Sequence, residues 1–291
     1  MANKRALVKR RKAIRNIRKI TRTMELIATS RFKRSLDRAS EAEAYTRKIG
    51  ELAADLSDSV TDIKHPLLEK RETIKKSVVL VLCSNRGLCG GYNASILREA
   101  GACLRETKAA SIDLQLELSG KRAIAYFRFQ GVPADHTYTH FEDKPSFEEV
   151  DVVASRYIAD YIAGKIDRVQ VVYMKFLNAS KQTPIIDTLL PLSTTPIASK
   201  GPAKKKVEYE FHPSAANILE EILPISFKIR LYKCFLDAAV SEQIARRVAM
   251  KAATENAGEI IRGLNLEYNR VRQAQITKEI SEIIGGVEAL K

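Results

Sequence analysis

The sequence predicts an α/β protein in which two long terminal helices form an antiparallel coiled coil and carry an inserted α/β domain. Both ends of the chain are almost free of proline and repeat apolar residues at helical spacing, whereas the middle alternates strand and helix patterns. Helices this long are not stable in water without a packed face, so the two ends are expected to pair. The expected segments are 1–65 and 214–291 for the helices, 75–192 for the α/β domain and 193–213 for a linker.

Charge is concentrated at the start of the chain. The 291 residues carry a net charge of +14, and residues 1–38 hold fourteen Lys and Arg against Glu25 and Asp37. Such a balance indicates nucleic acid, a membrane surface or acidic proteins as partners. The basic, amphipathic start also resembles a transit peptide, but its periodicity continues past residue 38, which favours a structural helix. The four cysteines form no CxxC motif, so reduced thiols are expected.

The first helix is predicted over residues 3–62, where the only glycine is Gly50, and Pro66 ends it. Its apolar and small residues alternate spacings of three and four, as in a coiled-coil seam. Polar residues interrupt this seam, so loose packing is expected there. The predicted seam consists of Ile14, Ile17, Thr21, Met24 and Ala28, then the polar Arg31, Ser35 and Arg38, then Ala42, Tyr45, Ile49, Leu52 and Leu56.

The middle of the chain predicts a mainly parallel, Rossmann-like sheet with helices on its faces. The run at 77–83 is apolar throughout, as in a strand buried on both faces, whereas 112–118 alternates and predicts a half-buried strand. Further strands are expected at 134–140, 168–176 and 184–190. Helices are expected from Asn93 to Lys108, over 120–130 and over 146–163, with Asn93 and Ser146 as N-caps.

The last helix is predicted from about Ser214, with a break or kink at Pro224. From Pro224 to Gly285 the pattern runs for roughly 60 residues, about 90 Å at 1.5 Å per residue. Small residues dominate the face expected to meet the first helix, which would let the two helices approach closely. The predicted seam is Ala245, Ala249, Ala252, Asn256, Ile260 and Leu264.

The turn SNRGLCGGYN at residues 84–93 lies between a strand and a helix, where phosphate-binding loops occur. Its spacing fits neither GxGxxG nor GxxxxGK[ST], so a structural turn is favoured over a nucleotide site. Cys89 lies in this turn, but none of the four histidines has a spacing that suggests a dyad with it or a metal cluster. We therefore expect no catalytic residue, no cofactor and no metal.

The basic first helix leaves three interpretations open. It would bind nucleic acid by neutralising phosphates, but with Phe32 as its only aromatic residue it offers no stacking platform. A solvated charged face is the second interpretation, and an acidic protein surface that faces this helix is the third. A nucleotide-using enzyme built on residues 77–190 is a further alternative, which lacks the loop motif.

Three motifs resemble the gamma subunit of F-type ATP synthases. IRNIRKITRTMELIATSR at 14–31 is similar to the first helix of that family, SNRGLCGGYN to its turn after the first central strand, and residues 241–289 to its last helix. ITKE, Glu282 and Gly285-Gly286 follow the family's terminal signature, with Val287 where alanine is usual. The motifs occur in the family's order and span both ends and the centre of the chain.

The resemblance implies a central-stalk rotor subunit without catalytic residues of its own. Its coiled coil would stand inside a ring of three alpha and three beta subunits and couple proton-driven rotation of the c ring to ATP synthesis or hydrolysis. The epsilon subunit would be a further partner, and nucleic acid would not be one. The expected location is the cytoplasmic side of a bacterial plasma membrane, reached through the complex.

The resemblance also implies partner contacts at particular residues. Arg272, Gln273, Thr277 and Glu279 match polar residues that touch a beta loop near the top of the shaft. Met24 matches a position near the lower beta contact, with Glu242 and Arg246 on the opposing helix. Glu210 matches the region that meets the c ring. The apolar end of the last helix, from Ile276 to Val287, would suit a bearing that binds no orientation tightly.

Overall fold

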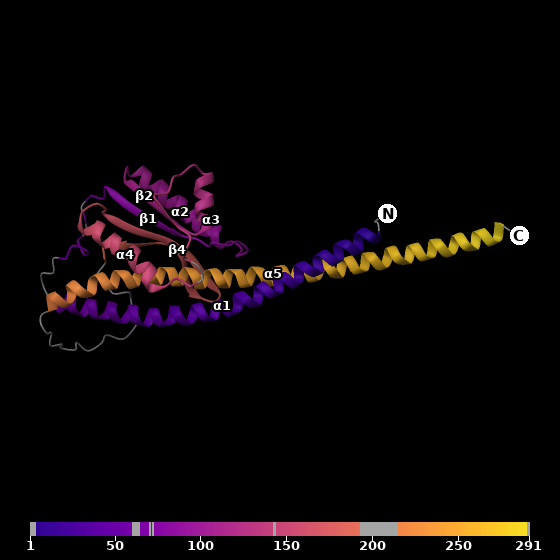
Figure 1. Ribbon diagram of the computed structural model, residues 1–291, viewed down its shortest axis with the longest axis horizontal. Coiled ribbons are helices and arrows are strands. Elements are labelled where there is room, and N and C mark those ends of the chain that lie inside the picture. The colour runs from indigo at the N-terminus through magenta and orange to yellow at the C-terminus, as the bar shows by residue number, and fades with distance from the viewer. Residues whose placement is uncertain are drawn as a thin grey trace. The chain divides into compact units, whose positions relative to one another are not determined.

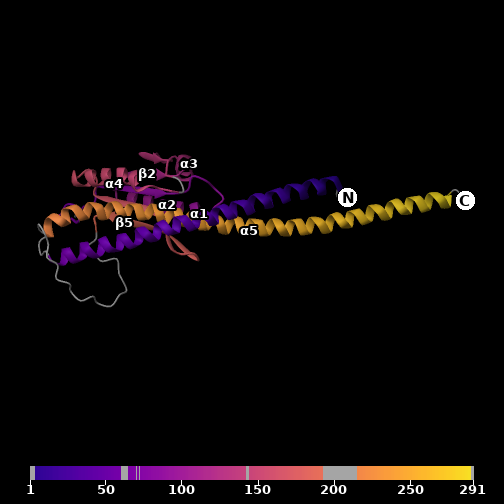
Figure 2. The same cartoon turned by 60° about the horizontal axis from the view of Figure 1, so that its bottom comes forward.

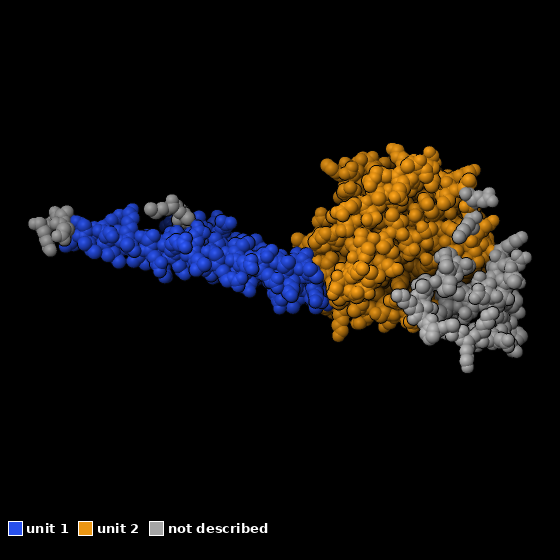
Figure 3. Space-filling view, turned by 180° about the vertical axis from the view of Figure 1, so that it is seen from behind, with its two compact units in different colours: residues 1–29, 246–291 blue, residues 30–245 orange. Residues whose placement is uncertain are grey.

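The protein divides into two compact units (Figure 3). Unit 1 comprises residues 1–29 and 246–291, and unit 2 comprises residues 30–245. The computed structural model describes residues 4–59, 65–69, 71, 73–141, 144–192 and 215–289. Two helices, α1 (Lys4–Ser59) and α5 (Ala215–Ala289), contribute to both units and pack against each other within each of them (Figure 1). The predicted fold class, long terminal helices around an inserted α/β sheet, is confirmed.

Unit 2 contains a five-stranded sheet in the order β3-β2-β1-β4-β5. The first four strands of the chain pair in parallel, and β5 pairs antiparallel with β4, so the sheet is mainly parallel as predicted. The strands are β1 (Lys76–Leu82), β2 (Asp113–Ser119), β3 (His136–Tyr138), β4 (Arg168–Asn178) and β5 (Lys181–Leu190).

Helices cover both faces of this sheet (Figure 2). Alternate residues of β1 point to opposite faces, so that Val78 and Leu80 pack with α4 (Phe147–Ile162) and α5, whereas Val79 and Val81 pack with α2 (Tyr92–Ala109) and α3 (Lys121–Phe129). Because every residue of β1 after Lys76 is buried, the prediction of a strand covered on both faces is confirmed.

The strand β2 is more deeply buried than its alternating sequence predicts. Its first three residues are exposed or half-buried, but Leu116, Glu117, Leu118 and Ser119 are all buried. The prediction of a half-buried strand is therefore wrong for its second half, because helices cover both faces of the sheet there.

The starts of two helices were predicted with different success. Ser146 caps α4 through its hydroxyl, which accepts from Glu149 N at 3.2 Å, while Glu149 accepts from Ser146 N at 3.1 Å. The prediction of Asn93 as a cap is wrong: Gly91 is the N-cap of α2, and Asn93 lies inside the helix, where its side chain accepts from Ser84 N at 3.0 Å.

The helix α5 is continuous through Pro224, so of the two predicted possibilities, a break or a kink, the break is absent. Proline removes one helical hydrogen bond, at a cost of about 3 kcal/mol or more. Burial of Leu223, Phe227 and Leu231 against the sheet holds this stretch in place. Among the described residues, no helix combines the length and apolarity that crossing a bilayer requires.

The seam of α1 differs in places from the predicted one. Thr21 and Ala28 are buried, but Ile17 and Tyr45 are 47% and 54% exposed. The predicted loose packing in the middle is also wrong, because Ala39 is buried against Leu236 and Val240 of α5. Phe32 and Leu36 supply the apolar contacts that the predicted register omits, and they lie beside its polar positions. One of those polar residues, Ser35, is itself buried.

On α5 the observed seam lies one residue after the predicted one between Ala249 and Ile260, whereas Leu264 is buried as predicted. The buried residues there are Met250, Ala257, Ile261 and Leu264. Asn256 and Ala252 are exposed, and Ile260 is 45% exposed. The predicted seam contained three consecutive spacings of four, from Ala252 to Leu264, which depart from the alternating three and four that keep a coiled-coil face toward its partner.

Candidate functional site

The two helices of unit 1 run antiparallel and are joined by polar contacts as well as apolar ones. The hydroxyl of Thr254 donates to the hydroxyl of Thr21 at 2.9 Å, and Thr21 donates to the carbonyl of Arg18 at 3.1 Å. Further along the pair, Arg11 donates to Asn265 Oδ1 at 3.1 Å. Each step toward the N-terminus of α1 is a step toward the C-terminus of α5, which fixes the antiparallel direction.

A cationic groove follows this pair of helices. It has a volume of about 1570 Å³, and its lining includes Gly258, which lies next to the Arg18 guanidinium. Seven cations and two acids line it: Arg11, Lys12, Arg15, Arg18, Lys19, Arg22 and Arg262, with Glu255 and Glu259. Over its described residues, unit 1 holds seventeen Lys and Arg against seven Asp and Glu, a net charge of +10. This groove can attract an acidic surface.

The end of α5 presents the polar residues that the resemblance assigns to a partner contact. Arg272, Gln273, Thr277 and Glu279 are all exposed, and Glu279 accepts from Gln275 Nε2 at 2.9 Å. Large apolar side chains alternate with them and are also about half exposed or more, namely Ile276, Ile280, Ile283, Ile284 and Val287. Exposed apolar side chains at this density are typical of a surface that meets a partner.

The remaining assigned residues are placed differently. Met24 is half-buried on α1, and Glu242 is half-buried on α5, where it lines a small cavity of about 50 Å³ together with Cys83. Arg246 is 9% exposed and is therefore largely buried within the protein itself. Glu210 lies outside the described residues.

The turn between β1 and α2 is closed by its own polar groups. Ser84 Oγ donates to the carbonyl of Arg86 at 2.6 Å, and Asn93 Nδ2 donates to Cys89 Sγ at 3.2 Å. Burial, followed by the neighbouring Cys89 and Glu242, raises the pKa of the Cys83 thiol, which makes it a poor nucleophile. These bonds are those of a structural turn, which the sequence favoured over a nucleotide site.

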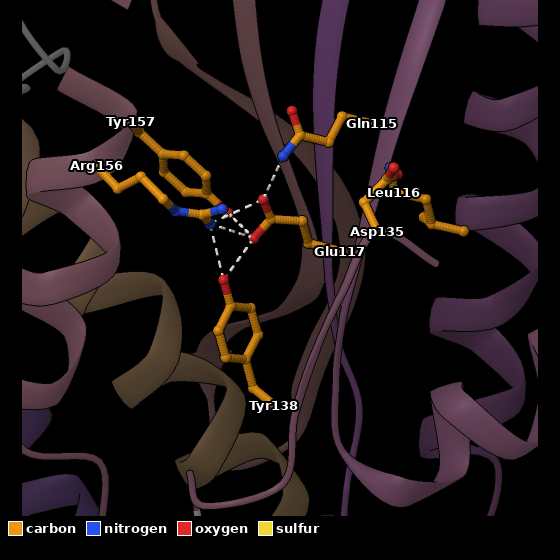
Figure 4. Close-up of polar contacts among 7 residues, drawn as sticks. All are labelled: Gln115, Leu116, Glu117, Asp135, Tyr138, Arg156 and Tyr157. Carbon is orange, nitrogen blue, oxygen red and sulfur yellow. Dashed lines mark hydrogen bonds and ion pairs between the residues drawn. The ribbon is translucent and has the colours of Figure 1, made fainter. Parts of the chain in front are cut away.

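A buried carboxylate network in unit 2 was missed by the sequence reasoning (Figure 4). Glu117 of β2 is fully buried, and its oxygens accept from Tyr138 at 2.7 Å, Tyr157 at 2.7 Å and Arg156 at 2.7 and 2.8 Å. Gln115 Nε2 donates to it at 3.0 Å. Burial is the main cause that raises the pKa of both tyrosines, and the Glu117 charge adds to it.

This network ties the strands β2 and β3 to the helix α4, which carries Arg156 and Tyr157. With both oxygens of Glu117 engaged by protein donors, its role is to hold elements together, not to bind a substrate. The alternating pattern of β2 predicted a strand with one exposed face and did not single out Glu117. The signal that could have predicted the burial of Glu117 is the general rule that parallel sheets are covered on both faces. In the part of the chain that the structure describes, no three His, Cys, Asp or Glu side chains are grouped as metal ligands would be.

The comparisons with known proteins agree along the whole chain. The family model described as ATP synthase matches residues 3–290. The chain is 55% identical to an ATP synthase gamma chain of Rhodopirellula baltica and 40% identical to one of Leptospira biflexa, with all of both chains covered in each case.

Solved structures agree in fold. A chain of the Euglena gracilis mitochondrial ATP synthase, in a structure of its OSCP, F1 and c-ring, superposes with a TM-score of 0.66 at 18% identity, covering 99% of this chain and 94% of that one. A chain of the Tetrahymena thermophila mitochondrial ATP synthase central stalk and c-ring gives a TM-score of 0.56 at 19% identity, covering 80% and 99%. By its sequence relatives and its fold, this chain belongs to the ATP synthase gamma chains, the non-catalytic rotor subunits of the central stalk.

Proposed function

We propose that this chain couples proton-driven rotation of the c ring to ATP synthesis and hydrolysis at catalytic sites on a ring of three alpha and three beta subunits. The observation that carries this proposal is the continuity of α5, which runs from Ala215 to Ala289 without a break and contributes to both units. A continuous helix paired with α1 resists twisting better than one interrupted by a loop, which a torque-bearing element needs.

The proposed contacts with beta lie on unit 1. Arg272, Gln273, Thr277 and Glu279 are exposed near the end of α5 and are available to a beta loop. The cationic groove supports an acidic beta loop as its neighbour, because opposite charges attract without demanding one fixed geometry. The exposed isoleucines around Ile280 offer a surface that can slide, since apolar contacts are non-directional.

Further contacts complete the proposed assembly. Met24, Glu242 and Arg246 are proposed to lie at the lower contact with beta, where burial of Arg246 makes it a support for this surface instead of an exposed contact. Glu210 is proposed to meet the c ring, and the epsilon subunit to bind beside it. The bacterial relatives support a location on the cytoplasmic side of a plasma membrane, held there through the complex.

Native mass spectrometry of the complex isolated from membranes tests this proposal. We expect one copy of this chain with three copies each of two larger subunits. A lone chain, or an adduct with nucleic acid, would reject the rotor role and support the alternative, a basic coiled-coil protein that binds nucleic acid.

A photo-crosslinking residue at Thr277 tests the upper contact in the same complex. We expect an adduct with beta from this position. The same residue at the exposed Lys108 of α2, in unit 2, is the control and should give none. Equal adducts from both positions would contradict the assignment.

A further inference from the structure

Asp237 is a buried carboxyl group for which the functions described above have no use. It lies on α5 in unit 2 and is 4% exposed. Its neighbours in sequence, Leu236 and Val240, pack against Ala39 of α1, and Phe176 of β4 packs against the same cluster. Asp237 therefore lies where α5 meets both α1 and the sheet, and an ionised carboxylate is costly in such a place unless cations compensate it.

Three charged side chains from three elements face Asp237. Lys233 precedes it by one turn on α5, Lys175 comes from β4 and Glu43 from α1. The Nζ atom of Lys233 lies 3.7 Å from Oε1 of Glu43, so this lysine forms the ion pair that links α5 to α1. Lys233 thus pairs with Glu43 of the other helix and acts electrostatically on Asp237 of its own.

The cluster next to Asp237 contains a further cation, Arg230 of α5, which lowers the pKa of the Cys234 thiol. The cations that act on Asp237 are Lys233 and Lys175. Asp187 of β5 belongs to the same cluster, as do the phenol of Tyr173 on β4 and the thiol of Cys234 on α5, which bond to each other. Burial, with these acids adding to it, raises the pKa of both the phenol and the thiol, so both remain neutral around pH 7. The charge that changes near neutrality in this cluster belongs to Asp237.

We propose that Asp237 is a proton-sensitive element that sets how tightly α1 is held to α5 in unit 2. With Asp237 neutral, Lys233 is left to Glu43, and the ion pair between the helices is at full strength. With Asp237 ionised, it competes with Glu43 for Lys233, and the link between the helices weakens. Acidification from pH 8 to pH 6 therefore tightens the pair.

The environment of Asp237 puts this change near neutral pH. Burial, the largest effect, raises its pKa to about 7; Lys233 and Lys175 lower the pKa, and Glu43 raises it. Because the pKa is higher in the folded chain than in the unfolded one, folding is favoured most below the unfolded pKa, near 4. The stability is lost as pH rises from there through about 7, which has the same sign as the weakening of the helix link.

Hydrogen–deuterium exchange of the full-length chain tests the proposal. Amide exchange of residues 36–49 in α1, corrected for the intrinsic pH dependence of the chemistry, should be about two- to fivefold slower at pH 6 than at pH 8, the change that one partly exposed ion pair gives. Carbon-detected NMR of labelled aspartates should show Asp237 titrating between pH 6 and 8. A titration below pH 5, or pH-independent exchange, would overturn the proposal.

Two variants test the roles of Asp237 and Glu43 separately. Asp237→Asn fixes the neutral form and should give slow exchange at both pH values. Glu43→Gln removes the partner on α1, whose carboxylate is 68% exposed, so the variant should fold and give fast exchange at both pH values. Asp113→Asn, at an exposed acid paired with Lys76, is the control and should keep the pH dependence of the unmodified chain. Full pH dependence in Glu43→Gln would refute the proposed exchange of partners.

Discussion

Thr21 and Thr254 share a hydrogen bond of 2.9 Å although 233 positions separate them in the chain. Thr21 is buried, and Thr254 is half-buried in the contact between α1 and α5 of unit 1. On either side of them along α1, Ala28 and Leu7 are both buried. Each hydroxyl also bonds a carbonyl of its own helix, Thr21 that of Arg18 and Thr254 that of Met250, so the bond between the two hydroxyls is the part of this network that depends on the register of the helices.

The threonine pair gives the first prediction. Thr254→Val should cost about 1 kcal/mol of unfolding free energy, since it takes a partner from the buried Thr21 hydroxyl. The double variant Thr21→Val/Thr254→Val should be less destabilised than the sum of the two single variants. Urea denaturation of all four proteins measures this, and strict additivity would show that the two hydroxyls do not interact.

The network around Glu117 gives a second prediction. Glu117→Gln should lower the unfolding free energy by about 3 kcal/mol, because it leaves the Arg156 guanidinium, 30% exposed, without its charge partner. Glu106→Gln, at an exposed acid of α2, should change it by less than about 0.5 kcal/mol. Thermal or urea unfolding checks both, and similar losses in the two variants would mean that the network does not hold β2 to α4.

Two glycines with left-handed backbone provide a matched test. Gly120 has φ of +96°, and a Cβ there would lie 2.1 Å from the carbonyl oxygen of Cys83. Gly131 has φ of +69° but no atom within 4 Å of such a Cβ. We expect Gly131→Ala to cost about 1 kcal/mol and Gly120→Ala at least about 3 kcal/mol, because backbone must move there. Equal losses of stability would contradict the close approach.

Met24 gives a prediction about coupling. Met24→Lys adds a charge to a half-buried position beside the proposed lower contact with beta. We expect the complex to assemble and hydrolyse ATP, but to pump fewer protons for each ATP hydrolysed. Proton pumping in inverted vesicles, measured against hydrolysis in the same preparation, checks this. Pumping that stays matched to hydrolysis would argue against the proposed position of Met24.

The sequence predicted those features that depend on local patterns. The run after Lys76 is continuously apolar and rich in β-branched residues, which favoured a strand buried on both faces, and Ser146 followed by Glu149 is a capping box that acts within one turn of helix. The features it missed depend on distant parts of the chain. Asn93 is a helix cap by local preference, yet it bonds to Ser84 because the turn folds back over it. Glu117 belongs to an alternating strand, and only the cover supplied by α4 buries it.

The coiled-coil seams also depend on distant parts of the chain, at the level of single residues. Spacing showed that α1 and α5 each have an apolar side, but Ile260 and Ile261 are equally good candidates for it. The choice of Ile261 depends on the partner helix, which is far away in the sequence. The proposed partner contacts of unit 1 were assigned through the family resemblance, since exposed polar residues such as Gln273 have no local sequence pattern that marks them.

The pairing of the two ends of the chain has a consequence for synthesis. Residues 4–29 leave the ribosome long before their partners at 246–264 exist, because Thr21 and Thr254 are 233 positions apart in the chain. Throughout this interval the nascent chain displays a basic segment whose apolar residues have no partner, which is prone to aggregate or to adhere to ribosomal RNA. Unit 1 can therefore close only once translation is nearly complete, and a prematurely terminated product would leave this segment uncovered.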